Sequence, residues 1–322
     1  MKNSLSTERL FDLIVFWYQS AFFEKWVYFR NRKIWMLARY LLILLLFSTT
    51  FTLSCCQREG GNPTKTKPQF DSIPTVVIVQ PTIVEASGIA DSKRNAGYLW
   101  VQEDGGTRGE IILLEHNGLI EKKIVIDGAS NRDWEDMSLS GNDIYIGDIG
   151  DNNSIQTEYR FYKFPEPLKG TDTVYNPDVI RFRYADGSHD AEAFLVEPST
   201  QAIYIITKRD NPSRIYKLTP PFSSSINVAD AVGQLTYGGV VSAAMAPDGK
   251  EIIIKTYFEL GYYKVGNGEK IETALSRTPT IIPYRPEPQG EAVCFSAVNN
   301  GYYTLSEKSF AADVRLYFYK RN

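Results

Sequence analysis

The stretch Asp133-Trp-Glu-Asp-Met137 decides the fold, because four other stretches of the chain can be aligned with it. These are Glu85-Ala-Ser-Gly-Ile89, Asp190-Ala-Glu-Ala-Phe194, Val241-Ser-Ala-Ala-Met245 and Gln289-Gly-Glu-Ala-Val293. The starting positions 85, 133, 190, 241 and 289 give offsets of 48, 57, 51 and 48 residues. A unit that recurs about every 50 residues is typical of a solenoid, an array or a propeller.

Each aligned stretch opens a short apolar strand, and the sequence predicts three more strands in each unit. Runs of β-branched and aromatic residues bounded by Gly, Asn, Asp and Pro are the signal for them. Second strands are expected at 98–101, 143–146, 202–206, 251–254 and 301–305. Third strands are expected at 111–115, 159–164, 214–218, 261–265 and 314–319, and fourth strands at 122–126, 179–184, 233–237 and 280–284.

The fifth unit contains only three of these strands, and a spare strand, Thr75 to Val79, lies upstream of the first unit. An open row of sheets would leave an exposed edge at both ends, which promotes aggregation. If the spare strand completes the last sheet, the ring closes. Residues 74–322 are therefore predicted to be all-β, forming a five-bladed β-propeller of four-stranded blades closed by the N-terminal strand. A two-sheet sandwich is the alternative, but it does not explain the fixed period.

The N-terminal segment resembles an export signal. Residues 36–56 contain a short basic region, an apolar run over 40–53 and then Ser54-Cys55-Cys56. This arrangement resembles the bacterial lipobox, and it predicts lipidation at Cys56 (or Cys55). Residues 57–73 are expected to be a flexible tether. We therefore expect a lipoprotein that is anchored in a membrane of the cell envelope by its acyl chain.

Residues 1–35 are unusual for a signal peptide. The segment 11–29 is aromatic and loosely apolar, but it carries Asp12, Glu24 and Lys25. One interpretation is a misannotated extension with Met36 as the true start, and the other is a second membrane-associated helix.

The charge balance argues against one class of partner. Residues 1–55 hold seven of the 35 Lys and Arg and three of the 38 Asp and Glu, which leaves 28 basic and 35 acidic residues, a net charge of −7. Binding to nucleic acid requires a basic patch, so nucleic acid is not expected as a partner. Cys294 is the only thiol of the domain and is expected to be a small buried side chain. We expect a monomer.

Two rings of polar residues should meet at one mouth of the central channel. The first ring is formed by the third residue of each aligned stretch: Ser87, Glu135, Glu192, Ala243 and Glu291. The second lies where the second strands end, and it holds Glu103 and Asp104, Asp148 with Asp151, Asn152 and Asn153, Lys208 with Arg209 and Asp210, Thr256, and Glu307 with Lys308. The gap at Ala243 favours a site, because a purely architectural lock would use one residue type in all five units.

Carboxylates crowded at one mouth require compensation from a cation, a basic side chain or a raised pKa. Oxygen ligands from Asp, Glu and Asn suit Ca²⁺ better than Zn²⁺. The predicted metal ligands are Glu135, Asp148, Asp151, Asn152, Glu192 and Glu291. In the alternative, the ring glutamates bond to backbone N–H groups of neighbouring blades and lock the ring, and the stretch 147–153 is only a tight Asx-rich turn.

Further residues near the rings are candidates for ligand binding or catalysis. Arg132, Trp134, Lys208 and Glu307 are predicted to contact a ligand. Glu135 and Glu192 are candidate acid and base residues, and His189, next to Asp190, could assist them as a general base. The alternative for His189 is an ordinary residue of a surface turn, and His116 is assigned no role.

Three motifs carry a resemblance to a known group. Asp133-Trp-Glu-Asp-Met137 with Gly147-Asp-Ile-Gly-Asp-Asn152, the stretch 184–193, and Ala246-Pro-Asp-Gly-Lys250 resemble motifs of uncharacterised bacterial exported β-propeller lipoproteins over about residues 74–322. More distantly, the architecture is similar to regucalcin/gluconolactonase-type and phytase-like propellers, which hold Ca²⁺ at the channel mouth. This resemblance implies a Ca²⁺ site, but their ligands cannot be matched here residue by residue.

Three functions fit these observations. The leading hypothesis is a lipid-anchored propeller that binds a small molecule, glycan or protein, together with Ca²⁺, at an acidic channel mouth. The second is a metal-dependent hydrolase of the lactonase, esterase or glycosidase type. The third is a protein-interaction scaffold, and the fold does not decide among them.

Overall fold

The computed structural model describes residues 69–322, and almost all regular structure in this part of the chain is strand. Its one short helix, α2 (Ile271–Leu275), packs Ile271 and Leu275 into the core. Residues 1–35 and 36–56, including Cys55 and Cys56, lie outside the described residues. Among the described residues, no helix has the length and apolar character needed to cross a bilayer.

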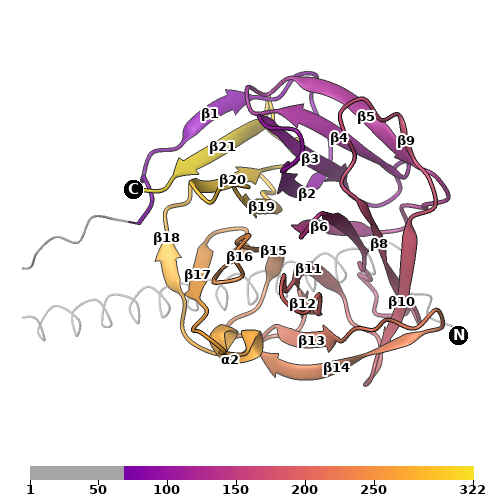
Figure 1. Ribbon diagram of the computed structural model, residues 1–322. Coiled ribbons are helices and arrows are strands. Elements are labelled where there is room, and N and C mark those ends of the chain that lie inside the picture. Colours follow the sequence, from indigo (N-terminus) through magenta and orange to yellow (C-terminus); the bar gives the residue numbers. More distant parts are fainter. Residues whose placement is uncertain (1–68) are drawn as a thin grey trace, which may run out of the picture. The chain divides into compact units, whose positions relative to one another are not determined.

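Five strands form a closed ring at the centre of the molecule (Figure 1). They are β2 (Ala86–Asp91), β6 (Trp134–Ser140), β11 (Ala191–Val196), β15 (Val240–Met245) and β19 (Ala292–Phe295). Each contacts the next, and β19 contacts β2. Nearly all of their side chains are buried, as expected for strands that are covered on both faces.

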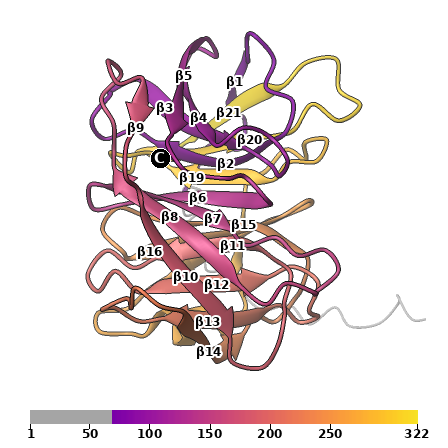
Figure 2. The same cartoon turned by 90° about the vertical axis from the view of Figure 1, so that its right-hand side faces the viewer.

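The remaining strands follow outward from this ring. Figure 2 shows the strands from the side, after a rotation of 90° about the vertical axis. The second strands are β3 (Tyr98–Glu103), β7 (Asp143–Asp148), β12 (Ile203–Thr207), β16 (Glu251–Thr256) and β20 (Gly301–Leu305). The third strands are β4 (Glu110–Glu115), β8 (Tyr159–Pro165), β13 (Arg214–Leu218), β17 (Leu260–Lys264) and β21 (Arg315–Lys320). The outer strands are β5 (Ile120–Ile126), β10 (Asp178–Tyr184), β14 (Asn227–Gln234), β18 (Thr280–Ile282) and β1 (Thr75–Ile78), and β9 (Thr173–Val174) is an addition.

These strands form four hydrogen-bonded sheets in the described part, whereas the sequence predicts five separate ones. Their orders are β1-β21-β20-β19, β15-β16-β17-β18, β2-β3-β4-β5-β9 and β11-β12-β13-β14-β10-β8-β7-β6. The eight-stranded sheet forms because the outer strands β10 and β14 pair in parallel, and β9 pairs with β5 in the same way. Both pairings cover outer edges that would otherwise expose unpaired backbone groups. The all-β, propeller-like architecture is therefore established, with two repeats merged at their outer strands.

One outer strand differs from its predicted position. β14 runs over Asn227–Gln234, whereas the sequence predicts a strand at 233–237. Most of its side chains are exposed, and only Ala229 is buried. It therefore lacks the apolar run that marks the other strands.

The predicted closing strand pairs with the last strand of the chain. β1 lies antiparallel to β21, with Thr75 opposite Phe318 and Ile78 opposite Arg315. Packing extends further upstream, since Phe70 is fully buried and forms a bridge with Arg321. The packed part of the chain therefore includes residues that were predicted to belong to the tether.

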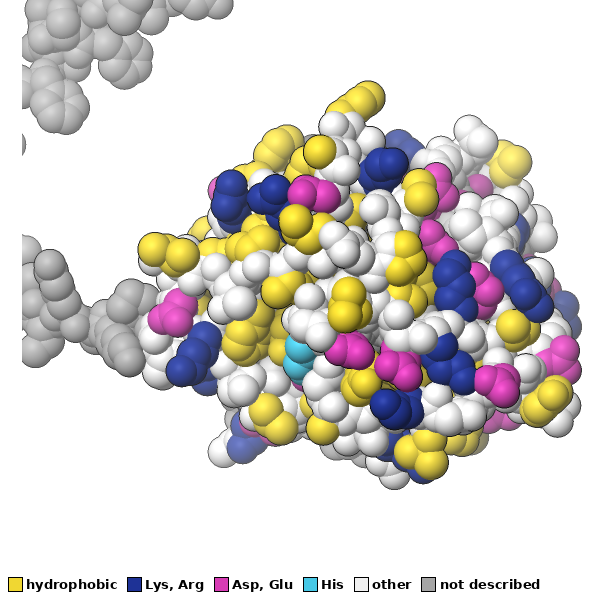
Figure 3. All heavy atoms as spheres, turned by 90° about the horizontal axis from the view of Figure 1, so that it is seen from above, with side chains coloured by type: hydrophobic (Ala, Val, Ile, Leu, Met, Phe, Trp, Pro, Cys, Tyr) yellow, Lys and Arg dark blue, Asp and Glu magenta, His cyan; other side chains and the backbone are white. Residues whose placement is uncertain are grey.

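The core is divided into five hydrophobic clusters, each between two consecutive repeats. Trp100 and Trp134, for example, come from neighbouring repeats and lie in the same cluster. Cys294 lies in another cluster, where burial raises the pKa of its thiol well above the usual value, so the prediction of a buried side chain is confirmed. The face that Figure 3 shows from above mixes acidic and basic side chains and has no continuous patch of one charge.

Candidate functional site

The first polar ring is positioned by β-bulges at the start of the inner strands. In β2, β6, β11 and β15 the pairing register shifts at one extra residue. A bulge of this kind re-aims the extra side chain. The extra residues are Ser87, Glu135, Glu192 and Val241. Glu291 is their counterpart in the last repeat, because Glu307 N donates to Gln289 O just as Lys208 N donates to Asp190 O.

The fourth position of this ring is a correction, because the sequence alignment places Ala243 there and the structure places Val241. Ala243 lies two residues further along β15, where its backbone N–H donates to Asp136 Oδ2 at 3.1 Å. The run 240–246 consists of small and apolar residues apart from Ser242, so it offers no acidic residue that would fix the alignment. The ring still contains three glutamates, and its fourth position is occupied by the apolar Val241.

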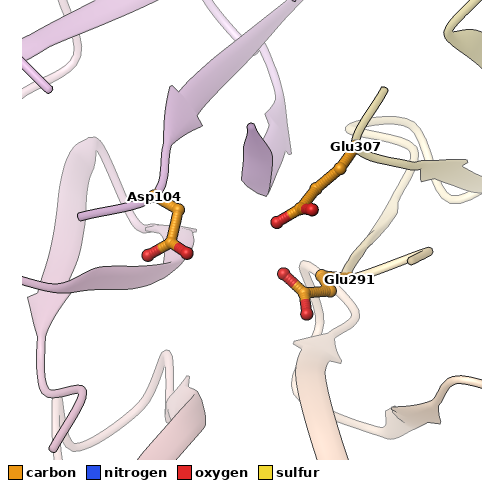
Figure 4. Close-up of side chains that lie close together, drawn as sticks. All are labelled: Asp104, Glu291 and Glu307. Carbon is orange, nitrogen blue, oxygen red and sulfur yellow. The ribbon is translucent and has the colours of Figure 1, made fainter. Parts of the chain in front are cut away.

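Six carboxylates gather around the ring, and we call them the mouth cluster: Asp104, Asp133, Glu135, Glu192, Glu291 and Glu307. Asp104, Glu291 and Glu307 point toward one another (Figure 4), and their carboxylate oxygens lie within 4.8 Å of each other. Asp104 also forms such a group with Asp133 and Glu135. Asp104 therefore belongs to both groups that could hold a cation.

Two members of the mouth cluster have no partner among the described residues. The Glu135 side chain is almost wholly buried, at 4% exposure, yet no hydrogen bond or ion pair involves its carboxylate. The half-buried Asp133 carboxylate likewise has none. Gly105 and Gly150 make room for both, since a Cβ on Gly105 would lie 2.6 Å from Asp133 Oδ1 and one on Gly150 would collide with Glu135 Oε1.

Burial and like charges favour protonation in the mouth cluster. Burial, with the nearby Asp133 and Glu291 carboxylates, raises the pKa of Asp104 to about 6. Burial and the adjacent Glu291 raise the pKa of Glu307 to about 8. The pKa of Glu135 also lies well above its ordinary value, because the group is desolvated and faces Glu192. A bound cation would therefore stabilise the ionised form of these carboxyls.

On the opposite side of the cluster lies Lys208, the one basic side chain among the described residues that forms an ion pair with a member of the cluster. Lys208 Nζ bonds to Glu192 Oε1 and donates to the Tyr257 hydroxyl at 3.2 Å. Tyr257 in turn donates to Glu291 Oε1. Glu192 keeps one oxygen without a partner, and burial raises its pKa to about 8 although Lys208 opposes this. The predicted site residues Lys208, Glu192 and Glu291 are thus brought together.

The side chains of Arg132, Trp134 and Asp148 have partners other than the carboxylates of the mouth cluster. Asp148 is fully buried and lies between two guanidinium groups, 3.7 Å from Arg132 Nε and 3.2 Å from Arg160 Nε. Trp134 has no exposed surface and packs against Tyr162 with ring centroids 5.7 Å apart, which places this predicted ligand-binding residue in the core instead.

Asp151 and Asn152 also have protein partners. Asp151 accepts hydrogen bonds from Ile155 N at 3.0 Å, Gln156 N at 2.8 Å and the Tyr159 hydroxyl at 2.7 Å. Asn152 Oδ1 accepts one from Arg209. These contacts correspond to the Asx-rich turn, the alternative that the sequence left open. Of the six predicted metal ligands, only Glu135 and Glu291 fall in the two cation-sized groups.

His189 lies in a separate network, and both of its ring nitrogens have partners. Nδ1 lies 3.1 Å from Asp210 Oδ2, and Nε2 lies 2.8 Å from the Tyr216 hydroxyl and 3.2 Å from Asp186 Oδ1. A general base needs a free nitrogen that faces the substrate. The arrangement favours a structural role for His189.

Sequence reasoning missed Asp136, which is fully buried at the centre of the ring. Its carboxylate accepts hydrogen bonds from Met137 N at 2.9 Å, Ser242 Oγ at 3.2 Å and Ala243 N at 3.1 Å. It thereby joins β6 to β15 across the ring. Asp133 and Tyr257 were also missed, although Asp133 lies two residues before Glu135 and Tyr257 directly follows Thr256.

Comparisons with known proteins add little beyond the architecture. No family model and no curated protein matches the sequence. Among solved structures, Kuenenia stuttgartiensis hydrazine synthase is similar with a TM-score of 0.39 and 13% identity, over 74% of this chain and 71% of that chain. A chain of a mitotic checkpoint complex is similar with a TM-score of 0.43 and 11% identity, over 84% of this chain and 98% of that chain. A luciferin-regenerating enzyme is similar with a TM-score of 0.46 and 8% identity, over 77% of this chain and 95% of that chain. At these scores the similarities carry no argument about activity or ligands.

Proposed function

We propose that this protein is an exported, lipid-anchored, five-bladed β-propeller that binds a ligand together with Ca²⁺ at the acidic mouth of its channel. The five inner strands and the five inter-repeat cores support the blade count, with β10 and β14 joining two blades at their outer edge. The mouth lies where the inner strands begin, so one ligand could contact residues from several repeats.

The Glu135 carboxylate carries the metal part of this proposal. A carboxylate with this degree of burial normally has hydrogen-bond donors or a counter-ion, because an unpaired buried charge is costly. Glu135 has neither among the described residues, and Asp104 and Asp133 lie within ligand distance of it. The donors are all oxygen, which suits a hard cation. Asp104, Asp133 and Glu135 would hold the ion, and bound Ca²⁺ would attract oxygen atoms of a ligand.

Calcium titration of the full chain by calorimetry tests the proposal. We expect binding with a dissociation constant of about 10⁻⁴–10⁻³ M, as in extracellular Ca²⁺ modules. Glu135→Gln should weaken binding at least about tenfold, because one charged ligand becomes a neutral one. Asp127→Asn, at an exposed carboxylate that has no side-chain partner, is the matched control and should bind like the wild type. Absence of Ca²⁺ binding by the wild type would refute the metal site.

A metal-dependent hydrolase is the second candidate, and the protonation of the cluster favours it. A pKa of about 6 for Asp104 and about 8 for Glu307 places two neighbouring carboxyls in the range used for acid and base catalysis. Glu135 and Glu192 remain candidates on the same grounds. Turnover of a panel of lactones, esters and glycosides, lost in Glu307→Gln, would support this candidate. Ligand binding without turnover would support the binding function, and capture of a protein alone would support a scaffold.

The cellular location is proposed from the sequence alone. Lipidation at Cys56, or at Cys55, would anchor the protein in a membrane of the cell envelope. Labelling cells with a radioactive fatty acid should mark the wild type and one of the two variants Cys55→Ala and Cys56→Ala. The unlabelled variant identifies the acylated residue, and labelling of neither the wild type nor the variants would refute the anchor.

A further inference from the structure

A pocket of about 660 Å³ opens beside the mouth cluster, over the fourth repeat. This volume is within the usual range for small-molecule sites. Three segments line it: the connection from β14 to β15, the loop between β16 and β17, and the start of β18. Tyr257 is part of its wall and also donates to Glu291 in the mouth cluster, so the pocket adjoins that cluster.

The wall of the pocket is largely aromatic and apolar. Tyr237, Tyr257 and Phe258 contribute rings, and the Phe258 side chain is 78% exposed. The Tyr237 hydroxyl is held by Tyr263 at 3.1 Å. Gly261 also lines the pocket, and a Cβ there would lie 2.8 Å from the Tyr237 hydroxyl. The absence of a side chain at Gly261 therefore leaves room for the Tyr237 hydroxyl and Pro279.

One carboxylate lines this apolar pocket. No hydrogen bond or ion pair involves the side chain of Glu259 among the described residues, although its backbone is fixed by Thr256, whose N–H donates to Glu259 O at 3.0 Å. No Lys or Arg is among the residues that line the pocket. The pocket therefore combines aromatic faces with one unpaired negative charge.

We propose that this pocket binds an organic ammonium compound whose apolar ring packs among Tyr237, Phe258 and Pro279 while its ammonium group pairs with Glu259. Aromatic faces attract cations through their quadrupole, and the carboxylate adds a direct charge interaction. A neutral or anionic compound with the same ring would lose both of these contacts, because each requires the positive charge. The proposal does not depend on the Ca²⁺ site, because the pocket does not include Asp104, Asp133 or Glu135.

Three phenyl compounds that differ only in their head group test this inference on the full chain. Calorimetry or ligand-observed NMR would compare 2-phenylethylamine, 2-phenylethanol and 3-phenylpropanoate at neutral pH. We expect the amine to bind at least about fivefold more tightly than the alcohol, and the carboxylate to bind most weakly. Equal binding of amine and alcohol, or no binding of the amine at millimolar concentration, would overturn the proposal.

Two variants place the binding in this pocket. Glu259→Gln and Phe258→Ala change exposed side chains, and each should weaken the amine about threefold or more. Asp127→Asn, which removes an exposed charge in the turn after β5, should leave the affinity unchanged. Amine binding should also persist in Glu135→Gln and in the presence of EDTA, which separates this pocket from the Ca²⁺ site. An amine affinity that Glu259→Gln does not change would refute the assignment to Glu259.

Discussion

Two neighbouring carboxylates on β6, Glu135 and Asp136, have opposite surroundings. Asp136 has no exposed surface and accepts three hydrogen bonds from two strands. Glu135 is nearly as buried but accepts none, and it faces Asp104 and Asp133. Successive side chains of a strand point in different directions, and the bulge at Glu135 re-aims that side chain. One side chain therefore points into the centre of the ring and the other into its mouth.

The difference separates an architectural carboxylate from an available one. Hydrogen-bond donors on β6 and β15 satisfy the Asp136 carboxylate, so this group needs no ligand from outside the protein. The mouth cluster lacks such donors, so its unbalanced charge can be relieved by protons or by a bound cation. The following predictions test this distinction.

Asp136→Ala should have the largest effect. It leaves the N–H groups of Met137 and Ala243 and the hydroxyl of Ser242 without their acceptor in the core. Each unsatisfied buried group costs about 1–3 kcal/mol, so we expect a loss of about 4 kcal/mol in the free energy of unfolding. Urea denaturation would measure it. Asp136→Asn, which retains one acceptor, should lose less, and a change below about 1 kcal/mol in the alanine variant would contradict the architectural role.

The same contrast explains which features of the fold could be predicted from the sequence. The strands of the repeats follow from apolar and β-branched runs, and β1 was expected because the last repeat has only three strands. The parallel pairing of β10 with β14 could not be predicted, because β14 is mostly exposed and has no apolar pattern. Its partner is determined by where two outer edges meet in space.

The candidate site was predictable only in part, for a related reason. Glu135, Glu192 and Glu291 were found because a carboxylate recurs at the same position of the repeat. The assignment at Ala243 failed because the register of β15 is set by a bulge at Val241, which has no distinctive residue type. The sequence could not distinguish Asp136 from Glu135 either, since only the packed structure shows which carboxylate receives donors.

The second prediction concerns pH. In the protein without Ca²⁺, burial and like charges raise the folded-state pKa of Glu192 and Glu307 to about 8, above their ordinary value. The folded state then binds more protons than the unfolded state between about pH 4.5 and 8, so stability falls as pH rises through this window. We expect a loss on the order of 3 kcal/mol between pH 5 and pH 9 in EDTA. Urea titrations across this range would show it, and stability that is constant or rises with pH would contradict it.

The third prediction concerns Glu135→Gln, whose effect on the free energy of unfolding should change sign when Ca²⁺ is present. In EDTA at pH 8, Glu135→Gln should raise the free energy of unfolding by about 1–2 kcal/mol, because it removes a buried charge among like charges. With Ca²⁺ at 100 times its dissociation constant, the wild type should gain about 2.7 kcal/mol and the variant much less. Thermal and urea unfolding with and without Ca²⁺ would measure both effects. If Glu135→Gln destabilises the protein in EDTA, the carboxylate has a partner and belongs with Asp136.

The smallest effect is expected at Asp151, which belongs on the architectural side of the comparison despite being predicted as a metal ligand. Although burial raises its pKa, hydrogen bonds from Ile155, Gln156 and Tyr159 outweigh this and hold the pKa below the ordinary value. Its contribution is present above the unfolded-state pKa and is lost as pH falls. Asp151→Asn should therefore cost about 1 kcal/mol at pH 7, less at pH 3, and leave the Ca²⁺ affinity unchanged. Calorimetry on this variant beside Glu135→Gln makes the comparison direct. A loss of Ca²⁺ affinity in Asp151→Asn comparable to that in Glu135→Gln would place Asp151 among the ligands, and the distinction between the two kinds of carboxylate would fail.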